Sequence, residues 1–112
     1  MIPEMPAKSI SAEVREEVHR MIDRFNQDEL GGGGIAYSAR FRGRHLYLDR
    51  DDGVGPEPIC RLTYTGDAKK WEFAIYKYST GQYDPDEFWF PGEELVDGTI
   101  EGAMRAGMEA YG

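Results

Sequence analysis

The apolar residues after Ser11 recur at spacings of three and four, which is the pattern of an amphipathic helix. Its apolar stripe consists of Val14, Val18, Met21, Ile22 and Phe25. Either Ser9 or Ser11 can cap this helix, because a serine hydroxyl accepts a hydrogen bond from a first-turn amide. The helix is predicted to run to about Leu30 and to end at the glycines 31–34. Because these glycines follow a helix C-terminus, they predict a helix terminator and joint rather than a phosphate loop.

Four later segments alternate between apolar and polar residues, as strands with one buried face do. They are IAYSARF at 35–41, HLYLDR at 45–50, ICRLTYT at 59–65 and WEFAIYKYS at 71–79. Short turns rich in glycine and charged residues join them, whereas parallel pairing would need long crossovers. We therefore expect a four-stranded antiparallel meander.

The C-terminal residues again show a helical spacing, with Asp97 or Thr99 as the cap. The stripe consists of Ile100, Ala103, Met104, Gly107, Met108 and Tyr111. Gly107 within the stripe predicts a close approach of the helix backbone to the sheet or to the first helix. The chain is thus predicted to be a single α+β domain over 1–112, ordered α-β-β-β-β-α. Both helices should pack on one face of the sheet, and residues 1–8 should form a flexible N-terminus.

Packing of both helices on one face leaves the other sheet face open. The expected inward residues are Tyr37, Ala39, Phe41, Leu62, Tyr64, Trp71, Phe73 and Ile75. The open face is the first candidate interaction surface, because arginine and tyrosine are enriched where interfaces carry their binding energy. Its candidate residues are Arg40, Arg42, Arg61, Tyr76 and Tyr78. A bulge near Gly43 or Gly53 would exchange the residues of the two faces.

Residues 81–96, which include YDPDEFWFPGEEL, are predicted to form an aromatic and acidic strap between the last strand and the second helix. If Phe88 and Phe90 pack inward, alternation turns Trp89 toward solvent or a groove. The strap is therefore the second candidate interaction surface. Its candidate residues are Trp89 and the acids Asp86, Glu87, Glu93 and Glu94.

The net charge of −8 is concentrated in the last third of the chain, where residues 81–112 hold eight acidic residues and one basic residue, Arg105. This charge opposes phosphate backbones, so nucleic acid is not an expected partner; it favours a basic partner or simply solubility. No apolar run reaches the roughly 20 residues of a membrane span, and the N-terminus MIPEMPAKSISAE lacks the features of a signal peptide. We therefore expect a cytoplasmic protein with no membrane partner.

Residues that commonly carry catalysis are few. The single cysteine, Cys60, belongs to the apolar set of its strand, which favours a packing role. His19 and His45 lie in no recognisable nucleophile or metal motif. In the acidic loop LDRDDGVGPEP, counting from Asp49 places Val54 where a helix-loop-helix calcium site requires glycine. No catalytic residue, cofactor or metal is therefore predicted.

With this strand set and the ending YDPDEFWFPGEELVDGTIEGAMRAGMEAY, the chain resembles small uncharacterised prokaryotic proteins. These proteins have a helix, four strands and a helix, and many are known only as domains of unknown function. The segment ICRLTYTGDAKKWEFAIYKYS is the core of the resemblance. It implies the fold and carries no catalytic or binding residues over to this chain.

The leading hypothesis is a non-enzymatic cytoplasmic protein-interaction module that binds a protein partner or forms a homo-oligomer through its open sheet face. Two alternatives remain open. One is a small enzyme or ligand-binding protein with a pocket between the sheet, the strap and the C-terminal helix. The other is an acidic inhibitor or immunity-type protein that binds a basic partner.

Overall fold

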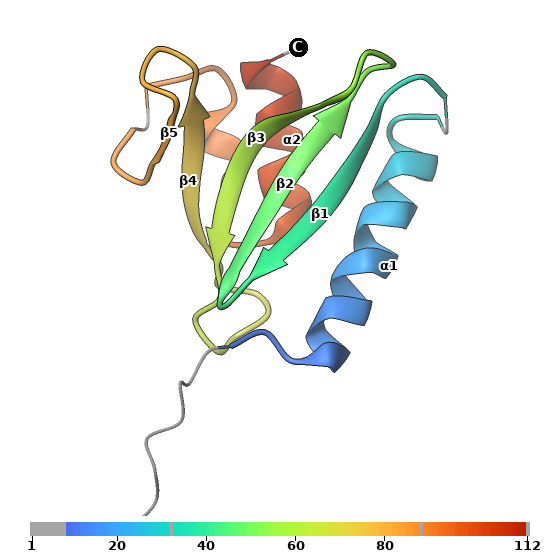
Figure 1. The fold of residues 1–112 in the computed structure, drawn as a ribbon, viewed down its shortest axis with the longest axis vertical. Coiled ribbons are helices and arrows are strands. Elements are labelled where there is room, and N and C mark those ends of the chain that lie inside the picture. The colour runs from blue at the N-terminus through green and yellow to red at the C-terminus, as the bar shows by residue number, and fades with distance from the viewer. Residues whose placement is uncertain (1–8, 32, 88, 112) are drawn as a thin grey trace, which may run out of the picture.

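The computed structural model describes residues 9–31, 33–87 and 89–111 of the 112-residue chain (Figure 1). Its elements are α1 (Ala12–Asp28), β1 (Ala36–Arg42), β2 (His45–Asp51), β3 (Pro56–Thr63), β4 (Glu72–Lys77), β5 (Gln82–Asp84), a 3-10 turn η1 (Glu93–Leu95) and α2 (Ile100–Ala110). The N-terminus 1–8 that we expected to be flexible lies outside the described residues, as do Gly32 of the glycine joint and Phe88 of the strap.

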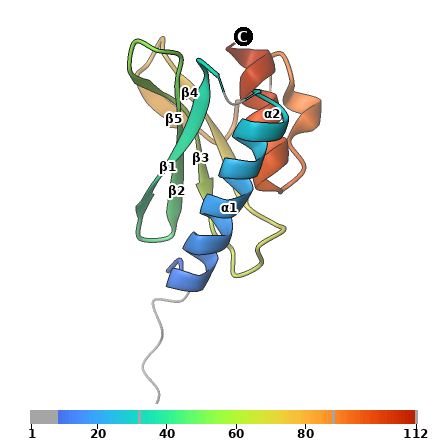
Figure 2. The ribbon, with the colours of Figure 1, turned by 90° about the vertical axis from the view of Figure 1, so that its right-hand side faces the viewer.

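The strands form one antiparallel sheet in the order β1-β2-β3-β4-β5, and both helices lie on the same side of it (Figure 2). The predicted α+β fold with a meander sheet and two helices on one face is confirmed. The sheet has five strands rather than four, because β5 pairs with the end of β4. A strand of three residues is too short for alternation to reveal it. Among the described residues, no helix is long and apolar enough to cross a membrane.

Helix α1 begins after one of the two predicted caps and ends at Asp28, two residues before the predicted end near Leu30. The Ser11 hydroxyl accepts a hydrogen bond from the Val14 amide at 3.2 Å, so Ser11 and not Ser9 is the cap. After the helix, Gly31 takes a φ of +75°, a left-handed conformation that glycine adopts without steric cost. The chain can therefore reverse direction and enter β1.

Strand β1 is an edge of the sheet, and α1 satisfies part of that edge. The side-chain amide of Asn26 donates to the Tyr37 carbonyl at 3.0 Å, and its oxygen accepts from the Tyr37 amide at 2.9 Å. These two bonds replace those that a further strand would make. They hold the C-terminal half of α1 against the start of β1.

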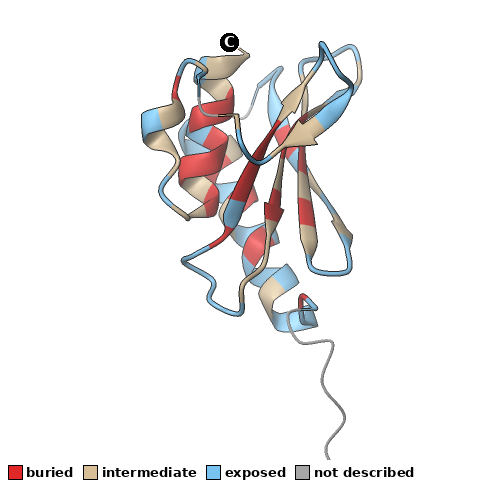
Figure 3. Ribbon diagram, turned by 90° about the vertical axis from the view of Figure 1, so that its left-hand side faces the viewer, coloured by how far each residue is buried: buried red, intermediate tan, exposed pale blue. Residues whose placement is uncertain are grey.

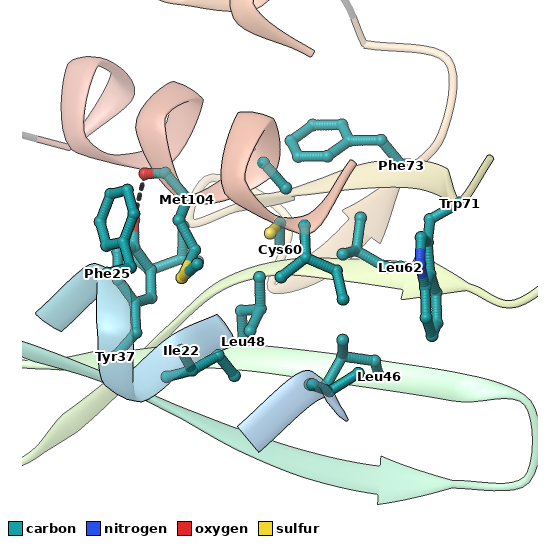
Figure 4. Close-up of a cluster of buried hydrophobic side chains, with 14 of the residues drawn as sticks. Ile22, Phe25, Tyr37, Leu46, Leu48, Cys60, Leu62, Trp71, Phe73 and Met104 are labelled. Carbon is teal, nitrogen blue, oxygen red and sulfur yellow. Dashed lines mark hydrogen bonds between the residues drawn. The ribbon is translucent and has the colours of Figure 1, made fainter. Parts of the chain in front are cut away.

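The hydrophobic core lies between the sheet and the two helices, where buried residues gather along α2 and the central strands (Figure 3). Leu46, Leu48 and Leu62 project from the sheet into the core, which Met104 of α2 also enters (Figure 4). The Tyr37 ring also enters this core, and its hydroxyl donates to the Met104 carbonyl at 2.7 Å. The hydroxyl of a buried tyrosine thus has a partner, as a buried polar group requires.

A bulge in β3 changes the alternation of the core residues. Leu48 pairs with Cys60, but Asp49 pairs with Pro58, so Ile59 is the extra residue. Ile59 and Cys60 are both buried, although simple alternation would turn Ile59 outward. The bulge lies in β3 and not near Gly43 or Gly53, and the predicted faces of the remaining strand residues are kept.

The bulge brings Ile59 against α2 at Gly107. A Cβ on Gly107 would lie 2.5 Å from Ile59 Cγ2 and 2.5 Å from the Tyr37 hydroxyl oxygen. The predicted close approach of Gly107 is therefore confirmed, and its neighbour is the sheet. Arg50 of β2 adds hydrogen bonds to the carbonyls of Gly107 and Tyr111 at the end of α2.

Replacement of Gly107 by alanine should destabilise the fold by about 1–3 kcal/mol, because an overpacked core forces its neighbours to shift. This loss should exceed the gain in helix propensity of close to 1 kcal/mol. Urea denaturation measures the free energy of unfolding. Gly34→Ala is the control, since a Cβ there meets nothing within 4 Å. Equal stability of the two variants would contradict the close approach.

Candidate functional site

The outer sheet face, which is the face turned away from the helices, carries rows of residues set by the strand register. One row contains Arg42, His45, Thr63 and Glu72, and the next contains Arg40, Tyr47, Arg61 and Ala74. Ser38, Asp49 and Pro58 lie side by side on β1 to β3, and Tyr76 pairs with Tyr83 on β4 and β5. Most of the predicted open-face residues therefore lie together. Tyr78 follows the end of β4 and lies at the rim of this face.

Arg40 does not offer a free charge on this face. Its guanidinium donates to both carboxylate oxygens of Asp49, at 2.5 and 3.1 Å, and lies 5.0 Å from the centre of the Tyr47 ring. Asp49 is only 6% exposed, so the carboxylate of this ion pair is buried while the arginine is partly exposed. The hydrogen bonds to Asp49 raise the pKa of Arg40. Arg40 is thus a structural residue that neutralises a buried carboxylate.

Five tyrosines form a continuous edge-to-face chain, here called the tyrosine layer. Its members are Tyr47, Tyr83, Tyr76, Tyr78 and Tyr111, with successive ring centres 5.3, 5.0, 4.8 and 5.3 Å apart. Tyr83 comes from the edge strand β5 yet contacts Tyr47 of β2. The small Ala74, opposite Arg61 in register, is also buried on this face. Much of the face that we expected to be open is therefore covered by its own side chains.

A cavity of about 240 Å³ opens at the end of the outer face near the β1–β2 turn, and we call it the basic cavity. It is lined by Arg44, His45, Arg61, Thr63, Glu72, Phe73, Ala74 and Pro85. Two guanidinium groups face a single carboxylate there. In the part of the chain that the structure describes, Nε of Arg61 is buried without a hydrogen-bond partner.

The pKa of His45 depends on the charges that line the basic cavity. Its Nδ1 lies 3.0 Å from the Thr63 hydroxyl. Burial lowers the pKa of His45 below its ordinary value, and the positive charges of Arg61 and Arg44 lower it further. Protonation of His45 is therefore disfavoured, and the charges that line the cavity are those of Arg44, Arg61 and Glu72.

The strap runs from the basic cavity toward α2. Phe90 stacks on Phe73 with ring centres 5.9 Å apart, whereas Trp89 is 90% exposed, as alternation predicts. Glu87 forms an ion pair with Lys77 at 3.2 Å. Asp84 pairs with the same lysine at 3.8 Å. The remaining strap acids, Asp86, Glu93 and Glu94, belong to no ion pair of the described residues.

A pocket between the sheet, the strap and the C-terminal helix was the alternative proposed from sequence. The strap contributes to two of the cavities in the described structure, and this alternative stays a prediction. Pro85 lines the basic cavity on the outer face, and Leu95 lines a cavity of about 310 Å³ between α1 and α2. The second cavity carries Glu29 and Arg105, which pair with each other at 2.6 Å. The charges of Glu29 and Arg105 are thus already paired, and Glu109 is the remaining charged residue of its lining.

The acidic loop and the cysteine have structural roles. The Asp51 carboxylate accepts bonds from the amides of Gly53 and Gly55, as in a polar hairpin turn. Within the described residues, no group of three or more His, Cys, Asp or Glu side chains is placed to hold a metal ion. Cys60 is fully buried, and burial raises the pKa of its thiol. It is therefore inert toward reagents in solution.

Several site residues escaped the sequence reasoning. Tyr47 and His45 alternate with Leu46 and Leu48, so the pattern of β2 alone could have placed them on the outer face. Arg44 stands in a turn, and Tyr83 in a three-residue strand. Neither position has a periodicity, so only the fold reveals that they join the site.

In comparisons with known proteins, the chain matches no family model, no curated protein and no solved structure. The resemblance to small prokaryotic proteins of unknown function therefore stays a prediction.

Arg40→Ala should destabilise the protein by about 1–3 kcal/mol, because it leaves the Asp49 carboxylate buried without its charged donor. Arg42→Ala should change stability by no more than about 0.5 kcal/mol, because its exposed side chain has no ion pair within the described residues. Urea denaturation of the two variants makes the comparison. A similar cost for both would show that the Arg40–Asp49 pair does not stabilise the outer face.

The His45 pKa should lie below 6.5 in an NMR titration of its ring protons. Arg44→Gln should raise it, because removal of a nearby positive charge makes protonation easier. Arg24→Gln, on the exposed side of α1, is the matched control and should leave the pKa unchanged. A His45 pKa that responds equally to both substitutions would remove the case for a local positive field.

Proposed function

We propose that this chain is a cytoplasmic, non-enzymatic protein-interaction module that binds an acidic protein surface with its basic cavity. The observation that carries this proposal is Arg61. Its Nε is a buried donor with no partner in the described residues, and the Arg61 side chain lines a cavity that an acceptor can enter. An unsatisfied buried donor costs about 1–3 kcal/mol, and an incoming carboxylate would remove that cost.

The charges around the cavity support the same partner. Arg44 belongs to the cavity lining, and Arg42 lies next to His45 in the register. Both are exposed, and neither belongs to an ion pair of the described residues. In a protein of net charge −8, a local excess of arginine gives an anionic group a specific place to bind.

The neighbouring tyrosine layer supports a protein partner rather than a free anion. Arg61 lies 5.7 Å from the Tyr83 ring, so the basic cavity and the tyrosine layer are continuous. Tyrosine offers a rigid apolar ring with a hydroxyl, and arginine and tyrosine together are typical of the centres of protein interfaces. Tyr78, which is 51% exposed, extends this surface to the rim.

A glutamate-rich peptide with an N-terminal fluorophore should bind the protein, and its affinity should fall as salt concentration rises. The double variant Arg44→Gln/Arg61→Gln should weaken binding by about tenfold, the effect of losing two charge pairs of about 0.7 kcal/mol each. Fluorescence anisotropy measures both effects. The control protein is Arg20→Gln/Arg24→Gln on α1, and the control peptide carries glutamine in place of glutamate.

Two outcomes would overturn the proposal. One is a peptide affinity that the cavity arginines do not affect. The other is binding of inorganic phosphate or citrate at the cavity, seen as an NMR shift of His45, with no binding of the peptide. The second outcome would indicate a site for small anions instead.

A further inference from the structure

We propose that the acidic partner is a second copy of this chain, and that the two copies form a closed dimer in which each strap docks on the basic cavity of the other. This inference rests on the proposed function and specifies its partner. It joins two features: the exposed Trp89 with the nearby acids Asp86 and Glu94, and the cavity arginines Arg44 and Arg61. Within the described residues, none of these four charged side chains forms an ion pair.

The strap has the composition of a ligand for an arginine-rich surface. Trp89 is 90% exposed, far more than the stacked Phe90 beside it. Asp86 and Glu94 are also exposed, and their carboxylates belong to no ion pair of the described residues. Tryptophan is enriched among the residues that dominate binding energy, and exposed acids supply the charge that arginines attract.

The basic cavity has the complementary chemistry. A guanidinium can stack on an indole ring and can also donate two parallel hydrogen bonds to a carboxylate. Arg44 and Arg61 provide two guanidinium groups in a cavity of about 240 Å³, and Nε of Arg61 lacks an acceptor within the described residues. One Trp and one acidic side chain from the second copy would therefore provide interaction partners for both guanidinium groups of the cavity.

The position of Pro85 explains why two copies can close on each other. Pro85 is a wall of the basic cavity, and the strap continues from it directly to Asp86 and Trp89. The docking segment and its receptor thus lie side by side on one molecule. A two-fold axis between two such molecules brings each strap to the other's cavity at the same time, which is the condition for a closed dimer.

Charge reversal tests the pairing of the strap with the basic cavity directly. Sedimentation velocity should show concentration-dependent dimers of the natural chain. Arg44→Glu alone and Asp86→Lys alone should each weaken self-association by about tenfold or more, because each adds repulsion at both contacts of the dimer. An equal mixture of the two variants should form heterodimers. In that mixture one contact pairs Arg44 with Asp86, and the other pairs the introduced glutamate with the introduced lysine.

Arg24→Glu and Asp28→Lys are the matched controls, since both lie exposed on α1 and change the net charge by the same amounts. Each should dimerise like the natural chain. Recovery of association in the mixture supports the proposal. Variants that associate as well as the controls, or a mixture that stays monomeric, would overturn it.

Trp89 provides a second readout. Trp71 is only 4% exposed, so acrylamide should quench its fluorescence weakly. The difference in acrylamide quenching between the natural chain and Trp89→Ala therefore measures Trp89. This extra quenching should decrease as protein concentration rises. Quenching that is independent of concentration overturns the dimer. If the monomeric protein still binds the glutamate-rich peptide through Arg44 and Arg61, the proposed function stands and only the second copy is excluded.

Discussion

The contact of Gly107 with the sheet is the constraint on which the rest of this structure depends. Three strands meet α2 there: Tyr37 of β1 and Ile59 of β3 leave no room for a Cβ, and Arg50 of β2 binds the Gly107 carbonyl. A cationic side chain near a helix C-terminus also interacts favourably with the helix dipole. Ile59 is the extra residue of the β3 bulge, and the bulge turns its side chain toward Gly107. The position of α2, and with it the closure of the core, follows from one glycine and one bulge.

The outer face of the sheet is stabilised differently from the face that the helices cover. There the Arg40–Asp49 pair and the tyrosine layer cover the central strands, so a face without a helix still buries Ala74 and Asp49. The arginines near the β1–β2 turn are not used in this way. Arg61 and Arg44 form no ion pair with the described part of their own chain, whereas Arg40 is paired with Asp49. The outer face therefore divides into a part whose charges are paired and a basic part. This division narrows the predicted interaction surface to one end of the sheet.

The acidic strap adds an opposite charge close to that basic end. It is held by Phe90 on Phe73 and by Gly92 against α2, where a Cβ would meet Glu109 and Ala106. The strap therefore lies close against the domain while Trp89 points away from it. The arrangement suits a surface that binds a partner without a large change of its own shape.

The sequence by itself predicted both helices, four of the five strands and an antiparallel meander, and it narrowed each helix cap to two residues; the structure chose Ser11 and Thr99 and gave the spatial order of the strands. These features are local, because hydrophobic periodicity and turn residues act over a few positions along the chain. Alternation also placed Arg61 outward and Trp89 away from the core. Only the tertiary structure decided that Arg40 is neutralised by Asp49, that Tyr83 reaches across the sheet, and that Arg44, His45 and Pro85 share one cavity. Those relations join residues far apart in sequence through register, a bulge and a short edge strand, none of which has a periodic signature.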